Sequence, residues 1–528
     1  MLERDYISPG RSAALGENGM AATSHPLATL AAIDVLRTGG NAMDAAIAAV
    51  AIQCVVEPAM TGVGGDCFAL VAPSGRPARA FNGSGWAPAG ISAEALRASG
   101  LNRIPETSPH AVTIPGAVDA WIQLSEAYGR RDLAELLAPA IALAEGGFRV
   151  TGRVAFDWAR DCARIGAGAA AAHFLPAGAP LRTGDRFANP ALARTLRLIA
   201  GKGRAGFYAG PVADELVAVL RGLGGAHNAA DFAEYRGFEA APISAEFRGH
   251  TLAECPPNGQ GLAALVIARI LDGFDLGEDA ASEADRIHLL AEASKAAYRL
   301  RDLLIADPAS MSVSVEEILS DPFINRLRAP IQLDQAAEAS IWDGPIHRDT
   351  VYLTVIDRDR NVVSLINSLF AHFGSGIYAP ECGVLLQNRG SGFSLTAGHP
   401  NEFAPRKRPL HTIIPALLLK DDVPLMPFGV MGGQFQAVGH AHFLTHVLDL
   451  GYDLQRANEA PRSFAFDGTL TLEPGFGERV RADLEQRGHR TIWAPRPIGG
   501  CQAILIDHQR GVLIGCSDHR KDGVALGY

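Results

Sequence analysis

The chain has 528 residues, of which 48% are hydrophobic and 20% are charged, so it is long enough to bury one large core or two of ordinary domain size. Its net charge is −10 and its isoelectric point is near 5.9. The sequence has no block of Lys and Arg that could follow a phosphate backbone, which argues against nucleic acid as a partner.

Cysteine usage and hydropathy predict a cytoplasmic location. The seven cysteines show no CxxC spacing, which suits buried thiols in a reducing compartment better than a disulfide framework. Residues 1–16 lack the apolar core of a signal peptide. The most apolar segment, 42–56, is interrupted by Asp44 and Gln53 and is too short to span a bilayer. We therefore expect a soluble protein without membrane contact.

The N-terminal part of the chain alternates between helix and strand signals. A helix is predicted over 24–40, because Ser24 and Pro26 are typical of a helix start and two glycines close the segment. A buried helix follows over 42–56. A Gly-rich turn then leads into a strand at about 67–72.

The middle of the chain is predicted to be mostly helical. Apolar residues recur at intervals of three and four over the segments 115–129, 133–148, 190–203, 211–225 and 287–304. Between them, the segment 243–257 is short and strand-like.

From Thr350 onward the pattern becomes rich in strands. Strand signals cover the segments 350–357, 360–370, 383–388, 413–421 and 425–433, and a helix is predicted over 439–454. The end of the chain, 501–518, has the pattern of a hairpin with its turn at 508–510. Because strands come in runs at both ends and helices lie between them, we expect a layered α/β fold with a largely antiparallel sheet.

We considered three other kinds of site, and the sequence argues against each of them. GKGRAG (201–206) matches a dinucleotide-binding pattern, but it follows a helical run rather than a strand, so a loop between two helices is predicted. No GxSxG is present, which excludes an α/β-hydrolase serine elbow. His440, His442 and His446 could bind zinc in a metal-dependent hydrolase, but no HExxH glutamate accompanies them. Packed or surface histidines are favoured, with no metal and no cofactor.

The stretch HRDTVYLTVID (347–357) places a threonine at the start of a strand. A threonine hydroxyl needs a neighbouring base, and cleavage of the bond between Asp349 and Thr350 would supply one, because the new α-amine lies within reach of the hydroxyl. Such a site also needs a hydrogen-bonding residue on the next strand, which Ser368 fits. It further needs backbone N–H donors for an oxyanion, which Gly432 and Gly433 fit.

Nearly the whole chain resembles the γ-glutamyltransferase (glutathione hydrolase) family of N-terminal-nucleophile hydrolases. The similar segments run in the family's order and include the N-terminal block GMAATSHPL…GVGGDCFALV (19–71), VTIPGAVDAW, LLAPAIALAEGGF, AECPPNGQG, LLAEASKAAYRLRD, DTVYLTVIDRDRNVVSLINS, FGSGI, GVLLQNRGSGF, RKRPLHTIIPALLL and MGGQ.

This resemblance implies an αββα sandwich that cleaves itself between Asp349 and Thr350. The products would be an α subunit of residues 1–349 and a β subunit of residues 350–528, joined as one heterodimer; whether heterodimers pair further is left open. The family's nucleophile falls on Thr350 and its second threonine, which steadies the nucleophile, on Ser368. The oxyanion hole falls on Gly432 and Gly433.

The sequence departs from the family where the family holds the amino-acid head group of its substrate. Ser84 stands in place of an arginine that binds the α-carboxylate, and Gly392 in place of an aspartate that binds the α-amine. Phe370 replaces an asparagine, and His411 and Thr412 replace two serines. An ammonium group would be left unpaired in such a pocket, at a cost of several kcal/mol.

The same loop gains Arg389, a bidentate carboxylate clamp if it faces inward. Phe370 and Trp86 would make the pocket narrower. These changes favour a small carboxylate-bearing amide as the substrate, with Arg389 and either His411 or Thr412 holding its acid group. Family members with NRG in this loop include oxamate amidohydrolases, which convert oxamate to oxalate and ammonia.

Three alternatives remain. One is a glutathione hydrolase or γ-glutamyltransferase, and the second is a cephalosporin-type acylase, because Arg389 could also meet a dicarboxylic acyl arm. The third, an uncleaved relative without enzymatic activity, is disfavoured, since a dead site has no chemical need for Thr350, Ser368 and the two glycines together.

Overall fold

The computed structural model describes residues 10–338 and 350–528, which form two seven-stranded sheets with only antiparallel pairings. The first sheet has the strand order β1 (Ala14–Gly16), β20 (Val512–Ser517), β19 (Gly500–Asp507), β15 (Val423–Met431), β14 (Ala416–Lys420), β9 (His250–Glu254) and β8 (Ile243–Phe247). The second has the order β21 (Val524–Gly527), β2 (Met20–Thr23), β10 (Val351–Ile356), β11 (Val362–Ser368), β3 (Asp66–Ala72), β4 (Arg79–Gly83) and β7 (Phe238–Ala240).

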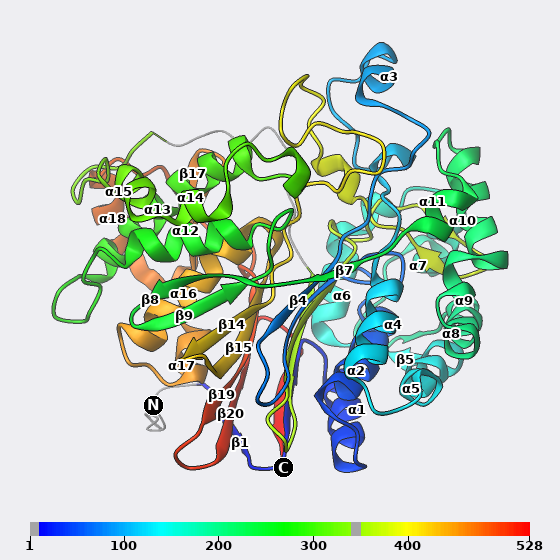
Figure 1. The fold of residues 1–528 in the computed structure, drawn as a ribbon, viewed down its shortest axis with the longest axis horizontal. Coiled ribbons are helices and arrows are strands. Elements are labelled where there is room, and N and C mark those ends of the chain that lie inside the picture. Colours follow the sequence, from blue (N-terminus) through cyan, green and yellow to red (C-terminus); the bar gives the residue numbers. More distant parts are fainter. Residues whose placement is uncertain (1–9, 339–349) are drawn as a thin grey trace.

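Helices cover the outer face of each sheet, so the molecule has four layers (Figure 1). The second sheet packs against α1 (Pro26–Arg37), α2 (Ala42–Val56) and α4 (Ala117–Tyr128), and α5 (Leu133–Gly146) and α8 (Pro190–Lys202) extend this helical layer outward from α2. The first sheet packs against α12 (Gly261–Leu271) and α16 (Gln436–Leu448), and α13 (Glu283–Leu304) lies on these two helices. The predicted αββα sandwich with antiparallel central sheets is therefore confirmed.

Strand β10 shows how the layers are held together. Tyr352 and Ile356 belong to the apolar cluster between the two sheets, whereas Leu353 and Val355 belong to the cluster under the helices. Successive side chains of a strand point to opposite faces. Both faces of β10 are covered, which explains why its sequence is mostly apolar rather than alternating.

The first two helices agree with the sequence except at one cap. All residues of α2 are buried, and Asn41 and Asp44 form a capping box at its start. Helix α1 begins at Pro26 as predicted, but its N-cap is His25, whose ring accepts from Leu27 N. Ser24, which we expected at this start, instead donates to the buried Glu57 at 2.7 Å.

Two features of the fold were not predicted individually. Helix α12 is buried except at Arg269, and it lies in the part of the chain predicted to be mostly helical, but no helix was assigned to it. A small sheet of β16 (Ser463–Phe466), β17 (Thr469–Leu472) and β18 (Thr491–Trp493) includes a parallel pair, β17 with β18. The GKGRAG motif (201–206) spans the end of α8, the connecting residues Gly203 and Arg204 and the start of α9 (Ala205–Tyr208), so it joins two helices as predicted.

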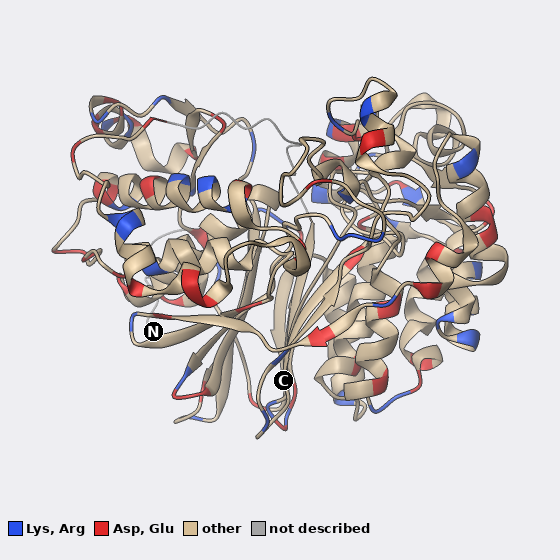
Figure 2. Ribbon diagram, turned by 45° about the horizontal axis from the view of Figure 1, so that its top comes forward, with Lys and Arg blue, Asp and Glu red and all other residues tan. Residues whose placement is uncertain are grey.

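Charged residues of both signs are interspersed over the outer helices, whereas the strands of the two sheets carry few (Figure 2). In the part of the chain that the structure describes, no helix combines the length and apolarity needed to cross a bilayer.

Candidate active site

Thr350 lies immediately before β10 at the end of the second sheet. Val351 pairs with Asn367 of β11, so the next pair outward brings Thr350 beside Ser368. The Thr350 side chain is fully buried and its Oγ1 donates to the carbonyl oxygen of Asn367 at 2.9 Å. Asn367 is itself held by Trp121, whose Nε1 donates to its Oδ1 at 3.3 Å. The predicted cleavage partner Asp349 lies outside the described residues.

Ser368 holds the turn that follows β11. Its Oγ accepts a hydrogen bond from Phe370 N at 2.9 Å. Phe370 has a φ of +77°, a left-handed backbone conformation that is costly for a bulky residue. This turn directs the buried ring of Phe370 toward Arg389, whose guanidinium carbon lies 3.9 Å from the ring centroid.

Arg389 faces inward and is almost fully buried, with 1% of its surface exposed. Its Nη1 donates to Thr412 Oγ1 at 2.8 Å, and its backbone N–H donates to Gln387 Oε1 at 3.1 Å. Neither Nε nor Nη2 has an acceptor among the described residues. Burial lowers the pKa of Arg389 to about 9, although Asp66 opposes this effect. One edge of this buried cation therefore has no hydrogen-bond acceptor among the described residues.

The glycine pair lies at the end of β15. Phe428 O is 3.5 Å from Ser364 Oγ, and Gly429 packs on the ring of Tyr352, so β15 runs toward the end of the second sheet that carries Thr350. Gly432 and Gly433 have φ values of +119° and +59°. A Cβ on Gly432 would come within 2.9 Å of Gly499 Cα. This position therefore requires glycine.

A buried polar network supports the glycine pair. Gln260 Nε2 donates to Gly433 O at 2.9 Å and to Thr412 O at 2.8 Å. Arg301 of α13 donates to Gln260 Oε1 at 2.9 Å and to Gln434 Oε1 at 2.5 Å. Gln260 thus connects the glycine pair to the residue that binds Arg389.

Asp66, at the start of β3, is a site residue that the sequence analysis did not single out. Its Oδ1 accepts from Gly85 N at 3.0 Å, Gly116 N at 3.2 Å and Gln387 Nε2 at 2.9 Å. Its Oδ2 lies 3.0 Å from His411 Nε2. Burial raises the pKa of Asp66 to about 7, while the charges of Arg389 and Arg408 and the backbone N–H groups lower it. The only available signal was an acid directly after a Gly-rich turn.

His411 is oriented by its two ring nitrogens. Nδ1 accepts from Ile413 N at 3.3 Å, so Nε2 carries the proton and donates to Asp66. The ring packs on Phe68 with centroids 4.7 Å apart. His411 therefore points toward Asp66, while its neighbour Thr412 is the residue that contacts Arg389.

Ser84 lies in a different part of the same network. It is fully buried, its Oγ accepts from Asn258 Nδ2 at 3.0 Å, and its carbonyl oxygen accepts from Arg408 Nε at 3.0 Å. Trp86 packs edge-on against Tyr235, with ring centroids 5.5 Å apart, and its narrowing of the pocket stays a prediction.

The histidine cluster of α16 does not form a metal centre in the described residues. His440 Nδ1 lies 2.7 Å from Glu254 Oε1, both fully buried, and His446 Nδ1 donates to the carbonyl oxygen of His442 at 2.7 Å. Burial lowers the pKa of His446 to about 4. A different trio, His288, Glu292 and His489, has ligand-type atoms within 4.8 Å of one another.

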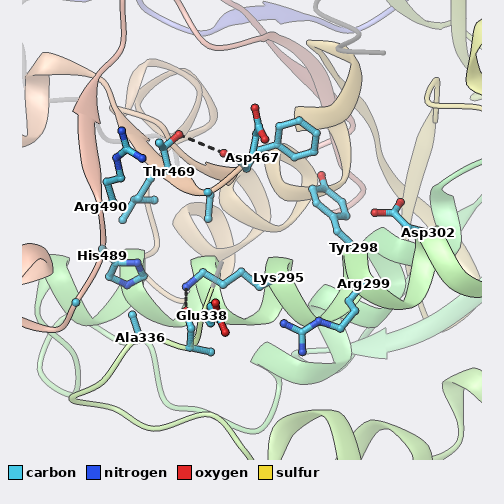
Figure 3. Close-up of a pocket in the computed structure, with 16 residues that line it drawn as sticks. Lys295, Tyr298, Arg299, Asp302, Ala336, Glu338, Asp467, Thr469, His489 and Arg490 are labelled. Carbon is cyan, nitrogen blue, oxygen red and sulfur yellow. Dashed lines mark hydrogen bonds between the residues drawn. The ribbon is translucent and has the colours of Figure 1, made fainter. Parts of the chain in front are cut away.

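One member of that trio, His489, lines a pocket of about 520 Å³ between α13, residues 336–338 and the three-stranded sheet (Figure 3). His288 Nε2 lies 2.7 Å from Gln332 O and its Nδ1 lies 2.8 Å from His489 Nε2. Lys295 pairs with Glu292 at 2.7 Å and donates to Ala337 O at 2.8 Å. Both ring nitrogens of His288 have hydrogen-bond partners, and Glu292 is paired with Lys295. These contacts hold the segment before residue 339 against α13.

A larger pocket, of about 790 Å³, adjoins the loop that carries Arg389. It is lined by residues that include Ser391, Gly392 and Phe393 of that loop and Leu410, which precedes His411. Arg103, Arg164 and Glu106 lie farther along its wall. This pocket therefore extends outward from the position where Gly392 has no side chain.

The fold and this arrangement belong to a known class. The sequence profile of the Gamma-glutamyltranspeptidase family matches residues 28–528, and the chain is a member of that family. It is thus an N-terminal-nucleophile hydrolase acting on amide C–N bonds.

Individual relatives narrow the comparison. The chain is 35% identical to the glutathione hydrolase-like YwrD proenzyme of Bacillus subtilis, over 97% of this chain and 99% of that protein. It is 34% identical to the oxamate amidohydrolase proenzyme of Klebsiella pneumoniae, over 98% and 100%. Cephalosporin acylase from Bacillus halodurans has a similar structure, with a TM-score of 0.93 and 38% identity over 100% and 99% of the two chains.

Proposed function

We propose that this protein is a self-processing amidohydrolase that removes ammonia from a small carboxylate-bearing amide, with oxamate as the favoured substrate and oxalate as the product. The observation that supports it is the buried edge of Arg389, whose Nε and Nη2 have no acceptor among the described residues. A carboxylate is the ligand that matches two parallel N–H groups of a guanidinium.

The proposed processing is cleavage between Asp349 and Thr350, which gives an α subunit of residues 1–349 and a β subunit of residues 350–528. The relatives described as proenzymes support this view. We place the resulting heterodimer in the cytoplasm.

In the proposed reaction the free α-amine of Thr350 takes the proton from Oγ1, and Oγ1 attacks the amide carbonyl. The N–H groups of Gly432 and Gly433 hold the oxyanion. The protonated α-amine then gives its proton to the departing ammonia, which leaves an ester on Thr350. Water, deprotonated by the same amine, hydrolyses that ester and releases the dicarboxylate. Ser368 orients the nucleophile, and Arg389 with Thr412 holds the substrate acid.

The glutathione hydrolase alternative requires a partner for the α-ammonium of a γ-glutamyl group. Asp66 is the buried acid closest in the network, but both of its oxygens already accept hydrogen bonds, three at Oδ1 and one at Oδ2. This saturation disfavours an amino-acid head group.

A cephalosporin-type acylase is the second candidate. The pocket of about 790 Å³ beside Gly392 has room for a longer acyl arm than oxamate offers, and the similar Bacillus halodurans protein is described as a cephalosporin acylase. In that case Arg389 would bind the far carboxylate of a dicarboxylic acyl group.

Release of ammonia from oxamate and glutamine, of cysteinylglycine from glutathione and of the acyl group from a glutaryl cephalosporin, measured in parallel, tests the proposal. We expect the largest kcat/KM for oxamate. Preference for a γ-glutamyl compound or for the cephalosporin would replace the proposed substrate with the corresponding alternative.

A further inference from the structure

Asn388, next to Arg389, carries a second buried donor group without an acceptor. Its side chain is fully buried, and its Oδ1 accepts from Ala371 N at 3.1 Å, which fixes the orientation of the amide. Nδ2 has no acceptor among residues 10–338 and 350–528. Buried polar groups are nearly always hydrogen-bonded, so this NH2 group requires an explanation, and its place next to Arg389 makes a shared ligand one that can be tested.

The unpaired donors of Asn388 and Arg389 lie against the same short segment. Asn388 N donates to Leu369 O at 3.3 Å and its side chain contacts Ala371 N. The guanidinium of Arg389 lies on the ring of Phe370, between those two residues. That segment directly follows Ser368, which lies beside Thr350. Both donor groups are therefore positioned at the turn next to the nucleophile.

One carboxylate could accept hydrogen bonds from the unpaired N–H groups of both Asn388 and Arg389. A carboxylate has two oxygens and about four positions for hydrogen bonds. The Nε–Nη2 edge of Arg389 would use two of them, and a further donor can use a third. We propose that Asn388 is a specificity-determining residue, whose Nδ2 donates to the same substrate carboxylate that Arg389 binds. This inference rests on the proposed function and assigns the site to amides with an acyl carboxylate.

The test compares oxamate with oxamide, a neutral amide of the same shape, in the self-cleaved enzyme. Asn388→Asp keeps an oxygen for Ala371 N and replaces the donor with an acceptor. We expect the ratio of kcat/KM for oxamate to kcat/KM for oxamide to fall about tenfold to a hundredfold, the range for loss of one hydrogen bond to a charged group. The inhibition constant of oxalate should rise by a similar factor. Both substrates report on the same folded fraction, so the ratio is insensitive to partial unfolding.

Gln436→Glu is the matched control. Gln436 is also fully buried, its Oε1 accepts from Ile414 N at 2.9 Å, and its Nε2 has no acceptor in the described parts of the chain. Its side chain contacts residue 414 rather than the turn at 369–371, so we expect an unchanged ratio. An equal fall in both variants would mean that any buried negative charge is sufficient, and would overturn the assignment of Asn388.

Arg389→Ala distinguishes a failure of the role assigned to Asn388 from a failure of the proposed carboxylate site. If its ratio falls and that of Asn388→Asp does not, the role of Asn388 is wrong and the proposed function stands. If neither ratio changes, the carboxylate site itself is wrong. Should Asn388→Asp fail to cut itself, Asn388→Ser keeps a side-chain oxygen and goes through the same comparison. Failure of both to yield processed enzyme would assign Asn388 to folding or self-cleavage and refute the inference.

Discussion

His411 Nε2 lies 3.0 Å from Asp66 Oδ2, although the two residues are 345 positions apart and the proposed cleavage site falls between them. Both side chains are buried, and Arg389 and Arg408 act on the same carboxyl group. The bond thus joins the two proposed subunits beside Arg389, at the base of the proposed carboxylate site. If that site binds an anion, the charge of Asp66 should affect how strongly it does so.

We expect the KM for oxamate to rise as the pH increases through neutrality. The pKa of Asp66 is raised to about 7, so below this pH the carboxyl group is neutral and the charge of Arg389 is uncompensated. Above it, the carboxylate offsets that charge and binding of an anion weakens. Initial-rate measurements across neutral pH check this.

Oxamide is the control substrate, since its KM should not depend on this ionisation. Asp66→Asn should remove the pH dependence of KM for oxamate. A parallel change of KM for both substrates would contradict this role of Asp66, because a shared change would report on the α-amine of Thr350 or on the fold.

Thr350→Ala should remain a single chain of 55.7 kDa on a denaturing gel and should have no activity, because it lacks the hydroxyl that attacks both the scissile bond and the substrate. Thr354→Ala is the matched control. Thr354 is equally buried on the same strand, and its Oγ1 donates to Val363 O at 2.9 Å as Thr350 does to Asn367 O. Thr354→Ala, unlike Thr350→Ala, should cleave itself and be active. N-terminal sequencing should show that its smaller fragment begins at Thr350.

Arg389→Ala should lower kcat/KM for oxamate about a hundredfold or more while self-cleavage continues, because two hydrogen bonds to a charged group are lost. Arg389→Lys should recover little of this, since an ammonium cannot present two parallel N–H groups. Arg97→Ala removes the same charge from an arginine that pairs with Glu402 at 2.7 Å in the adjoining loop, and should leave KM unchanged. A normal KM in Arg389→Ala would rule out the clamp.

Gly432→Ala should reduce kcat by about a hundredfold to a thousandfold, the usual loss for one displaced oxyanion donor. The new Cβ would lie 2.9 Å from Gly499 Cα at a φ of +119°, so the loop must shift. Gly451→Ala tests the backbone effect alone, because Gly451 also has a positive φ, +63°, but nothing lies within 4 Å of its Cβ position. Equal kcat values in the two variants would exclude Gly432 from the oxyanion hole.

Local patterns in the sequence predicted the elements that depend on local chemistry. Helix α2 has the predicted bounds, Ala42–Val56, and the terminal hairpin turns where Asp507 and Val512 pair. Helix α12 was missed because its apolar run, interrupted only by Arg269, is short, and periodicity alone does not distinguish such a run from a buried strand. The parallel pairing of β17 with β18 was also missed, since short-range patterns do not specify long-range partners.

At the candidate site, the sequence by itself determined the candidate residues Thr350, Ser368, Arg389 and the glycine pair, because each is defined by its residue type and its neighbours in the chain. Only the tertiary structure decided that Arg389 is buried on Phe370 and that Asp66 lies behind His411. The physical reason is that burial and charge pairing depend on contacts between distant segments, and these form only when the two sheets pack together.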